Sequence, residues 1–408
     1  MPQPLPTLLF GAFDRHNLGD LLFPYVAARL LDNDDLLFAG LVERDLSSVG
    51  GYQTRSISQL AKELGRRPLN ILHVGGELLT CEAWQAAVMV QSPEQAQAII
   101  RRLEAKSVER EAWVHNALKL SAQAPYTVSR ELFPGAACVI YAAVGGVELD
   151  ERAEPFRAEV ITKLAGADYV SVREQQTQAC LKRYGINARL VPDPAVMVAA
   201  LFERRIEQCA GEGEVAAMLA AFPHGYVAFQ CSAAFGDDET LKQIAIQLAR
   251  LVAESGYGVV LFRAGAAPWH DDLECYQRLA ALMGSTQVKI FESLNIWDIC
   301  ALIARSHAYC GSSLHGRIVA MAFGLPRVNL SHPRKEGRSG KQVAYAATWE
   351  LPGIPATVEV AQLAAVIQQA LATDRAQLTI HAQALAARYL EEFTVIRALV
   401  DSPMERRG

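Results

Sequence analysis

Short apolar runs alternate with amphipathic, helix-like segments along almost the whole chain. Apolar runs of about four to eight residues are typical of strands buried on both faces, and helices between them let neighbouring strands run parallel. In the first half, this pattern predicts strands at Thr7 to Phe13, Asp35 to Val42, Leu69 to Val74, Ala137 to Val144, Asp168 to Val172 and Ala188 to Val191. The alternation predicts an α/β fold with helices on both faces of a parallel sheet.

A second series of strands follows a segment, residues 199–223, whose charge-interrupted pattern predicts helix only. Strands are then predicted at Tyr226 to Gln230, Val259 to Phe262, Val288 to Phe291, His307 to Cys310 and Arg327 to Leu330. We therefore expect two Rossmann-like parallel-sheet lobes facing a cleft. Their predicted bounds are an N-terminal lobe, 1–198, a helical linker, 199–223, a C-terminal lobe, 224–372, and a last helix packing across both lobes, 373–408.

Two further segments have helical patterns of their own. In the helix predicted after Gly236, Asp237 or Asp238 can cap the start and Gly256 closes the end. Residues 106–132 are helical or loop-like between two strands, and we expect an insertion over the cleft.

The composition excludes several classes of protein. The 408 residues suit two domains, and 20% charged residues with a net charge of -5 lack the basic excess that nucleic-acid binding needs. The N-terminus has no signal-peptide pattern and no stretch approaches about 18 apolar residues, so we expect a cytoplasmic protein without a transmembrane segment. The eight cysteines form no C-x-x-C pair, and we expect reduced, mostly buried thiols.

The first candidate site follows the first predicted strand. Asn17, Gly19 and Asp20 open a helix there, and a helix start presents backbone N–H groups that can bind an anion or a sugar. An ordinary loop in which Asn17 or Asp20 only caps the helix explains the pattern equally well. The loop matches neither a dinucleotide-binding motif nor a Walker A motif, which weakens a nicotinamide or ATP interpretation.

Two glycines, Gly75 and Gly76, follow the third predicted strand, with Glu77 next to them. Paired glycines after a strand mark close approach of a backbone or a ligand, and a plain tight turn is the alternative. His73 lies inside the apolar run, where we expect a hydrogen-bonded core histidine rather than a catalytic one.

Arg173 follows the strand predicted to end at Val172. Its guanidinium is always charged and forms a planar fork suited to phosphate or carboxylate. Asp193, between two prolines, is expected beside the same sheet edge, where it can orient Arg173. A purely structural salt bridge from Arg173 to Glu174 or Asp193 is equally compatible with the sequence.

The sharpest motif follows the strand predicted to end near Cys310. Gly311 to Ser313 make a turn whose small hydroxyls on Ser312 and Ser313 and exposed amides suit an anion, Leu314 is a further binding candidate, and His315 begins an amphipathic helix. A histidine there can transfer a proton near neutral pH, although it can also serve only in capping. We favour function because several anion-binding groups would converge.

Two lysines, Lys335 and Lys341, lie in a basic stretch after the last predicted strand. The stretch is either a solvated surface or a phosphate-facing loop at the sheet edge.

At these residues the chain resembles the polysaccharide pyruvyltransferase family, whose members are two-lobed enzymes of the glycosyltransferase B (GT-B) type. The resemblance runs from Gly11 to about Leu351 and rests on the order and spacing of Gly11, Asn17, Gly19, Asp20, Gly75, Gly76, Val172, Arg173, Asp193, Pro194, Ser312, His315, Gly324 and Pro326. One departure is Gly75 to Glu77, where the family commonly has three glycines.

The resemblance implies transfer of a pyruvyl group from phosphoenolpyruvate to a sugar acceptor, free or lipid-linked, in exopolysaccharide, capsule or cell-wall assembly. It implies that Arg173, His315 and one lysine hold the donor: spacing favours Lys335, and the helix-like sequence that follows favours Lys341. His315 is the candidate acid, and Asp20 or Glu77 the candidate base. We expect no cofactor and no metal, since the sequence has no ligand spacing for one. A lipid-linked acceptor would bring the protein to the inner face of the membrane.

Two alternatives stay open. A nucleotide-sugar glycosyltransferase or epimerase of the same two-lobed shape could place a diphosphate at the helix start near His315. A non-catalytic glycan- or anion-binding protein would bind ligand without releasing phosphate.

Overall fold

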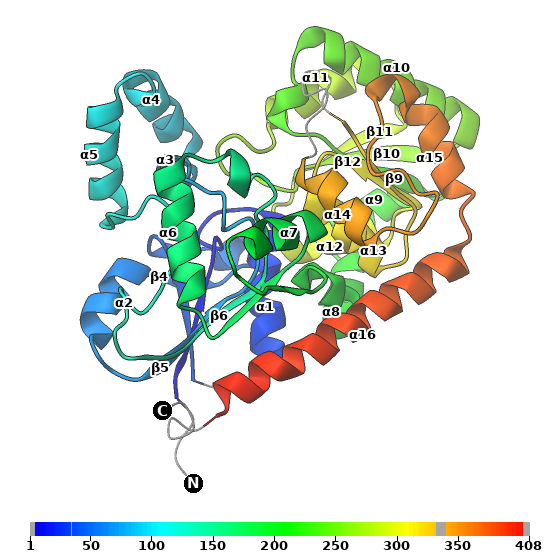
Figure 1. Cartoon of the computed structure of the whole chain (residues 1–408). Coiled ribbons are helices and arrows are strands. Elements are labelled where there is room, and N and C mark those ends of the chain that lie inside the picture. The colour runs from blue at the N-terminus through cyan, green and yellow to red at the C-terminus, as the bar shows by residue number, and fades with distance from the viewer. Residues whose placement is uncertain (1–4, 34, 332–339, 403–408) are drawn as a thin grey trace. The chain divides into compact units, whose positions relative to one another are not determined.

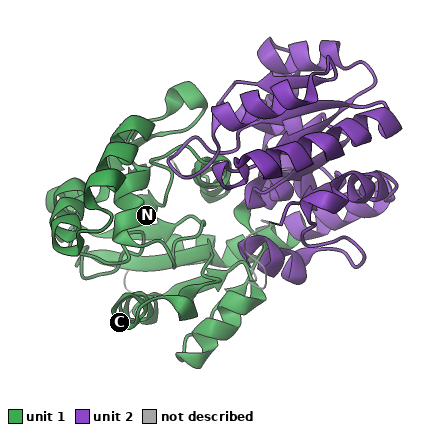
Figure 2. Ribbon diagram, turned by 90° about the horizontal axis from the view of Figure 1, so that it is seen from above, with its two compact units in different colours: residues 1–194, 387–408 green, residues 195–386 purple. Residues whose placement is uncertain are grey.

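The computed structural model describes residues 5–33, 35–331 and 340–402. The chain divides into two compact units: unit 1 contains residues 1–194 and 387–408, and unit 2 contains residues 195–386 (Figures 1 and 2).

Unit 1 contains an eight-stranded sheet in its described residues, in the order β3-β4-β2-β1-β5-β6-β7-β8. The predicted strands all pair in parallel, and the one antiparallel pair in the described residues, β3 with β4, lies at an edge that was not predicted. The strands are β1 (Thr7–Phe10), β2 (Leu36–Gly40), β3 (Arg44–Asp45), β4 (Gln53–Ser56), β5 (Leu69–His73), β6 (Ala136–Val144), β7 (Tyr169–Val172) and β8 (Arg189–Leu190).

Helices connect these strands as in other parallel sheets. One apolar core joins alternate strand residues such as Leu8, Ile71 and Tyr141 to the helices on that face. The helices of unit 1 are α1 (Leu18–Leu31), α2 (Ile57–Leu64), α3 (Ala83–Met89), α4 (Pro93–Leu103), α5 (Ser107–Leu118), α6 (Glu154–Ala165) and α7 (Gln175–Arg183).

Unit 2 contains a five-stranded parallel sheet in its described residues, in the order β11-β10-β9-β12-β13. The strands are β9 (Tyr226–Gln230), β10 (Gly258–Phe262), β11 (Val288–Phe291), β12 (Ala308–Gly311) and β13 (Arg327–Asn329). The helices are α8 (Val198–Ala210), α9 (Gly213–Ala221), α10 (Asp238–Ser255), α11 (Leu273–Met283), α12 (Ile296–Ala304), α13 (Leu314–Ala322), α14 (Lys341–Trp349) and α15 (Leu363–Leu371), and α16 (Arg375–Val400) has residues in both units. Helix α10 packs against α11 and α15 over one face of the sheet (Figure 1).

Both sheets share one feature that positions a site. In each, the first strand along the chain lies inside the sheet, and the strand order reverses beside it: between β1 and β5 in unit 1, and between β9 and β12 in unit 2. Such switch points, at the carboxyl ends of parallel strands, are where open α/β sheets bind ligands.

The strands predicted from apolar runs are all present, with small differences at their ends. Helix α10 is capped by Asp237, whose side chain accepts from Thr240 N, and ends at the left-handed Gly256, as predicted. Strands β3 and β4 were not predicted, because they are short and their exposed positions are polar.

The division of the chain differs from the predicted one. It falls at Pro194, and the segment predicted as a linker forms α8 and α9 within unit 2, where α8 packs against α12 and the ring of Phe202 lies edge to face with that of Trp297 at 5.0 Å. Helix α16 forms where a last helix was predicted, but its residues belong to unit 2 up to Ala386 and to unit 1 from Ala387.

Two further observations concern the cysteines and the long helices. All eight cysteines lie in the described residues as free thiols, seven of them buried and Cys209 partly exposed. Of the helices in the described residues, none is both long and apolar enough to cross a membrane.

Candidate functional site

A cluster of buried polar side chains lies just after β1, at the switch point of unit 1. Asp14 is fully buried, and its Oδ2 accepts from Leu41 N at 2.6 Å while its Oδ1 accepts from the Tyr126 hydroxyl at 3.0 Å. Arg15 Nη1 donates to the same hydroxyl at 3.1 Å. Burial raises the pKa of Asp14, although Arg15 opposes it. Asp14 and Arg15 were not among the residues predicted from the sequence, although polar residues directly after a buried strand can indicate a site.

The predicted residues of the first loop lie next to this cluster. Asn17 is the N-cap residue of α1 but makes no side-chain capping bond, and Gly19 and Asp20 lie in the first turn. Asp20 Oδ2 is 3.7 Å from Arg15 Nη2. A Cβ atom added at Gly76 would lie 3.0 Å from Asp20 Oδ1, so the structure brings Asp20 and Gly76 together.

A second cluster surrounds Arg173 at the end of β7. Its side chain is fully buried, and Nε donates to Glu174 Oε1 at 2.6 Å and Nη1 to Asp193 Oδ2 at 2.9 Å. Nη2 donates to Glu77 Oε2 at 2.7 Å. The two salt bridges that would give Arg173 a purely structural role, to Glu174 and to Asp193, are therefore both present, and Glu77 is a third partner.

Among the side chains given for this cluster in the described residues, carboxylates outnumber the guanidinium. Three carboxylates face one guanidinium, and burial raises the pKa of Glu174 to about 7 despite the opposing charge of Arg173. Of the three acidic side chains, Glu77 is 26% exposed and the other two are fully buried. A ligand can therefore approach the cluster from the Glu77 side, and an anion has to compete there with a carboxylate.

Glycines follow two neighbouring strands at this switch point, and one of them, Gly145, leaves room for the Arg173 cluster. Gly75 and Gly76 have φ values of 111° and 95°, which favour glycine. A Cβ atom added at Gly145 would lie 2.5 Å from Glu77 Oε2 and 2.6 Å from Arg173 Nη2. Gly145 was missed in the sequence analysis, although it begins a glycine pair after a strand just as Gly75 does.

His73 is a core histidine, as predicted. It is fully buried and stacked on Tyr141, its Nδ1 lies 2.9 Å from Ile140 O, and its Nε2 accepts from Val128 N at 3.0 Å. Because Nε2 accepts, Nδ1 carries the hydrogen and donates. Burial lowers the pKa of His73 to about 3.

This low pKa predicts acid sensitivity. The unfolded chain protonates His73 near pH 6.5 while the folded chain does not, so the imidazole's contribution to the free energy of unfolding is complete above pH 6.5 and falls by about 1.4 kcal/mol per unit below it. We expect His73→Phe to lose about 1–3 kcal/mol at pH 8, because two buried backbone groups lose a partner. Urea unfolding should show a smaller difference from wild type at pH 5 than at pH 8. A difference of equal size at both pH values would contradict this, and His224→Phe, at an exposed position, is the control.

In unit 2, Gln230 organises the switch point. Gln230 Oε1 accepts from the backbone amides of Ser312 and Ser313 at 3.0 and 2.8 Å, and its Nε2 donates to Asp271 Oδ1 at 2.7 Å. The two amides expected to stay exposed for an anion are therefore used within the protein, which corrects that expectation. Burial raises the pKa of Asp271 to about 7, against the lowering effect of the hydrogen bonds that it accepts. Gln230 and Asp271 could not be found from motif spacing.

The predicted residues around His315 come together at the start of α13. Ser313 is the N-cap residue and accepts from Gly316 N, and Leu314 and His315 follow in the first turn, both buried. Gln342 Nε2 donates to Ser312 O at 2.7 Å, which brings the start of α14 to this turn.

Of the two candidate lysines, only Lys341 lies in the described residues. Lys341 is exposed at the first position of α14, next to Gln342. Lys335 lies outside the described residues.

A network of buried ion pairs fixes the position of α13. Arg317 and Arg327, both almost fully buried, share the carboxylate of Glu350, with Arg317 Nη2 at 2.7 Å from Glu350 Oε2. Arg317 Nη1 also donates to Asn329 Oδ1 at 2.9 Å. These contacts fix the helix that carries His315, and nothing in the motif spacing indicated them.

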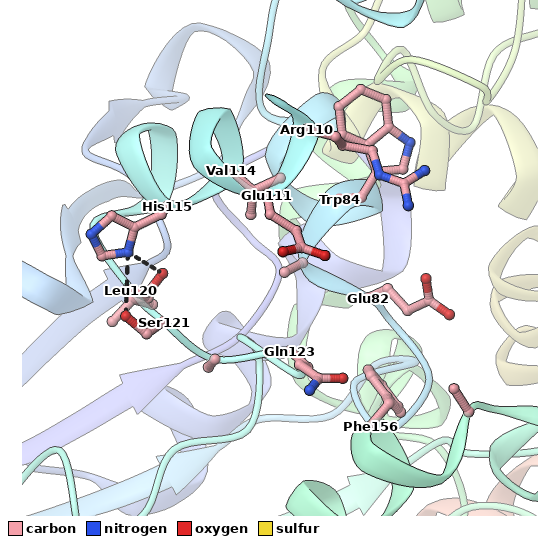
Figure 3. A pocket seen from close by; sticks show the side chains of 13 residues that line it. Glu82, Trp84, Arg110, Glu111, Val114, His115, Leu120, Ser121, Gln123 and Phe156 are labelled. Atoms are coloured by element: carbon pink, nitrogen blue, oxygen red, sulfur yellow. Dashed lines mark hydrogen bonds between the residues drawn. The ribbon is translucent and has the colours of Figure 1, made fainter. Parts of the chain in front are cut away.

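No group of three or more histidine, cysteine, aspartate or glutamate side chains in the described residues is placed to hold a metal ion. A cavity of about 550 Å³ lies in unit 1 between α3, α5 and the start of α6, away from the residues predicted from motifs (Figure 3).

Comparison with known proteins decides the family. The family of polysaccharide pyruvyl transferases matches residues 17–333, most of the chain. The chain belongs to this family. No curated protein matches significantly over its sequence.

Solved structures show which fold this family member has. UDP-GlcNAc 2-epimerase from Methanocaldococcus jannaschii, in complex with UDP-GlcNAc and UDP, matches with a TM-score of 0.52 and 12% identity, covering 91% of this chain and 94% of that chain. The trehalose-6-phosphate synthase OtsA matches with a TM-score of 0.51 and 10% identity over 98% and 99% of the two chains. These similarities and the two parallel sheets establish the GT-B-type fold of this pyruvyl transferase family member.

Proposed function

We propose that this enzyme transfers the pyruvyl group of phosphoenolpyruvate to two hydroxyls of a sugar in a polysaccharide or its precursor, forming a pyruvate ketal and releasing phosphate. Membership of the family supports pyruvyl transfer to a glycan in general. The observation that carries the donor chemistry is the switch point of unit 2, where His315 lies in the first turn of α13 and Gln342 ties the start of α14 to the same loop.

The proposed reaction needs two successive additions at one carbon. His315 protonates the methylene carbon of the donor, and a sugar hydroxyl oxygen bonds to the adjacent carbon while its proton passes to a base. A second hydroxyl oxygen then bonds to the same carbon and gives its proton to the now neutral His315, while the phosphate leaves with the electrons of the broken C–O bond. Glu77 and Asp20 remain the candidate bases, and Lys341 or Lys335 the candidate cation for the donor's charges.

The Arg173 cluster changes the role proposed for this arginine. Since Glu77, Glu174 and Asp193 already occupy its guanidinium, Arg173 is better suited to hold Glu77 in place than to clamp a phosphate alone. In this proposal Arg173 is a positioning residue for Glu77. We also propose that the reaction takes place in the cytoplasm, with a free acceptor or one at the inner face of the membrane.

Thermal unfolding tests the donor directly. A ligand that binds only the native state raises its apparent stability, by about 2.7 kcal/mol at a concentration of 100 times its Kd. We expect phosphoenolpyruvate to raise the melting temperature, and UDP-GlcNAc to leave it unchanged. A shift with UDP-GlcNAc alone would replace this proposal with a nucleotide-sugar enzyme. A shift with phosphoenolpyruvate but no phosphate release with any acceptor would favour a binding protein.

A further inference from the structure

The connection from β5 to β6 is longer than a parallel crossover needs. One helix suffices to return a chain to the next parallel strand, but residues 74–135 contain α3, α4 and α5. Helix α3 packs against both α4 and α5, so the three form one group at the edge of unit 1 (Figure 1). A binding site formed by these helices would account for the length of the connection.

The cavity of about 550 Å³ lies beside α3 and α5. This volume lies within the range of about 300–1,000 Å³ that small-molecule sites occupy. Trp84, Val114 and Phe156 supply apolar surface to it, and the side chains of Glu82, Glu111 and Gln123 lie around the same space (Figure 3). Aromatic rings that pack against C–H groups, with planar polar side chains that bond hydroxyls, suit the two kinds of surface on a sugar ring.

The polar groups of the cavity are held in place by the fold. Glu82 forms the capping box of α3 with Gln85 and accepts from Arg152 Nη1 at 3.1 Å. Ala83 N donates to Gln123 O at 2.8 Å, which ties the start of α3 to the loop that carries Gln123. Such preorganisation reduces the entropy lost on binding.

The aromatic wall is also fixed. The rings of Trp84 and Trp113 pack edge to face at 5.6 Å, and the guanidinium of Arg110 lies 5.6 Å from the centre of the Trp84 ring. Aromatic side chains so supported bind at low entropic cost.

The charge of the lining selects the ligand. The lining contains two acidic side chains, Glu82 and Glu111, and the guanidinium of Arg110, and Arg152 adds a second guanidinium by pairing with Glu82. These four charges balance, so the cavity has no excess positive charge to attract a phosphate or carboxylate, whereas hydroxyl groups can donate to the carboxylates. The cavity therefore suits an uncharged sugar rather than phosphoenolpyruvate.

A second cavity of about 400 Å³ adjoins the first. Both are lined by Leu120, Ser121 and Ala122, so they flank the same three residues. Glu159 holds the next part of this loop by accepting from Gln123 N at 2.9 Å. Two adjoining cavities along a fixed loop suit several linked sugars rather than one.

We propose that the cavity between α3 and α5 is a binding subsite for the neutral glycan chain of the acceptor, with Trp84 as its aromatic platform and Glu82, Glu111 and Gln123 as its hydroxyl partners. This inference rests on the proposed function for the identity of the glycan as an acceptor. It adds a site that holds the acceptor by sugar units other than the one that reacts.

Binding to an immobilised panel of neutral hexose oligosaccharides tests the subsite without any donor. We expect wild-type protein to bind at least one member, and Trp84→Ala and Glu111→Gln each to weaken that binding by about tenfold. Trp84→Phe should restore part of the affinity, since it keeps an aromatic ring. Glu109→Gln is the matched control, because Glu109 lies on the same helix but pairs with Lys106 and does not line the cavity.

The outcomes separate this inference from the proposed function. Phosphoenolpyruvate should raise the melting temperature of Trp84→Ala as much as that of wild type, which also shows that the variant folds. If no oligosaccharide binds, or if Trp84→Ala and Glu111→Gln bind as wild type does, the subsite is overturned, whatever phosphoenolpyruvate does. If the oligosaccharide binding results are as expected but phosphoenolpyruvate does not raise the melting temperature of the wild-type protein, the proposed donor is wrong and the subsite is supported.

Discussion

Arg173→Ala should lower the free energy of unfolding by about 3–5 kcal/mol, because removing one member of a buried ion cluster leaves its partners as uncompensated charges. Glu174 and Asp193 are both fully buried and both pair with this guanidinium. Water cannot replace the lost cation at these two positions, whereas Glu77 is partly exposed and can turn toward solvent. Urea or thermal unfolding measures the loss.

The pH dependence of that loss identifies its cause. Burial already raises the pKa of Glu174 to about 7 with Arg173 present, and without it the pKa rises further. A raised carboxyl pKa means that the folded state binds more protons than the unfolded state, so lowering the pH from 8 to 5 stabilises the variant relative to wild type. The defect should therefore shrink at pH 5; a defect independent of pH would mean that lost packing, not lost charge, is responsible.

Arg183→Ala is the matched control. Arg183 pairs with Asp150 on the surface of the same unit, and its side chain is 58% exposed. Such a pair contributes about 0–1 kcal/mol. If Arg183→Ala costs as much as Arg173→Ala, burial is not what makes the Arg173 cluster important.

This prediction also affects how activity data are interpreted. Loss of turnover in Arg173→Ala would follow from unfolding as easily as from a lost donor contact. Arg173→Lys keeps the charge but not the planar fork, so it should retain more stability and still misplace Glu77. A variant that is folded and inactive supports the positioning role, and one that is folded and fully active contradicts it.

Apolar periodicity was enough to predict most of the fold. Strands inside the sheets, such as β1 and β9, are buried on both faces, so each appears in the sequence as a largely apolar run. Strand β4 shows the limit of this signal, since its burial alternates residue by residue and its letters, QTRS, are polar. The unit boundary was misplaced because periodicity predicts that α8 is a helix but not that it packs against α12.

The sequence predicted where the candidate site residues lie but not which residues they contact. Motif order placed Arg173 and His315 at strand ends, which is where they lie. The partners could not be predicted, because Glu77 reaches Arg173 from 96 residues away and Gln230 reaches Ser313 from 83. Parallel sheets create such contacts between residues distant in sequence, and only the strand order identifies which ends are neighbours.

The largest effect on catalysis is expected from His315→Gln. General acid catalysis by a side chain contributes about 10²- to 10⁴-fold, and glutamine keeps a polar group of similar length but cannot deliver a proton in this pH range. We expect kcat for phosphate release to fall by about 10²-fold or more. The melting temperature should change little, because the start of α13 is held by the Ser313 cap and by the Arg317 network.

Two comparisons decide whether His315 acts as the acid. His224→Gln, at an exposed position of the same unit, should leave turnover unchanged. General acid catalysis gives the pH profile of kcat a limb on which activity falls as the pH rises, and we expect wild type to show this limb and His315→Gln to lack it. If the variant keeps the limb, another group delivers the proton. If kcat is unchanged while the KM for phosphoenolpyruvate rises, His315 binds the donor without protonating it, because only interactions specific to the transition state lower kcat when they are lost.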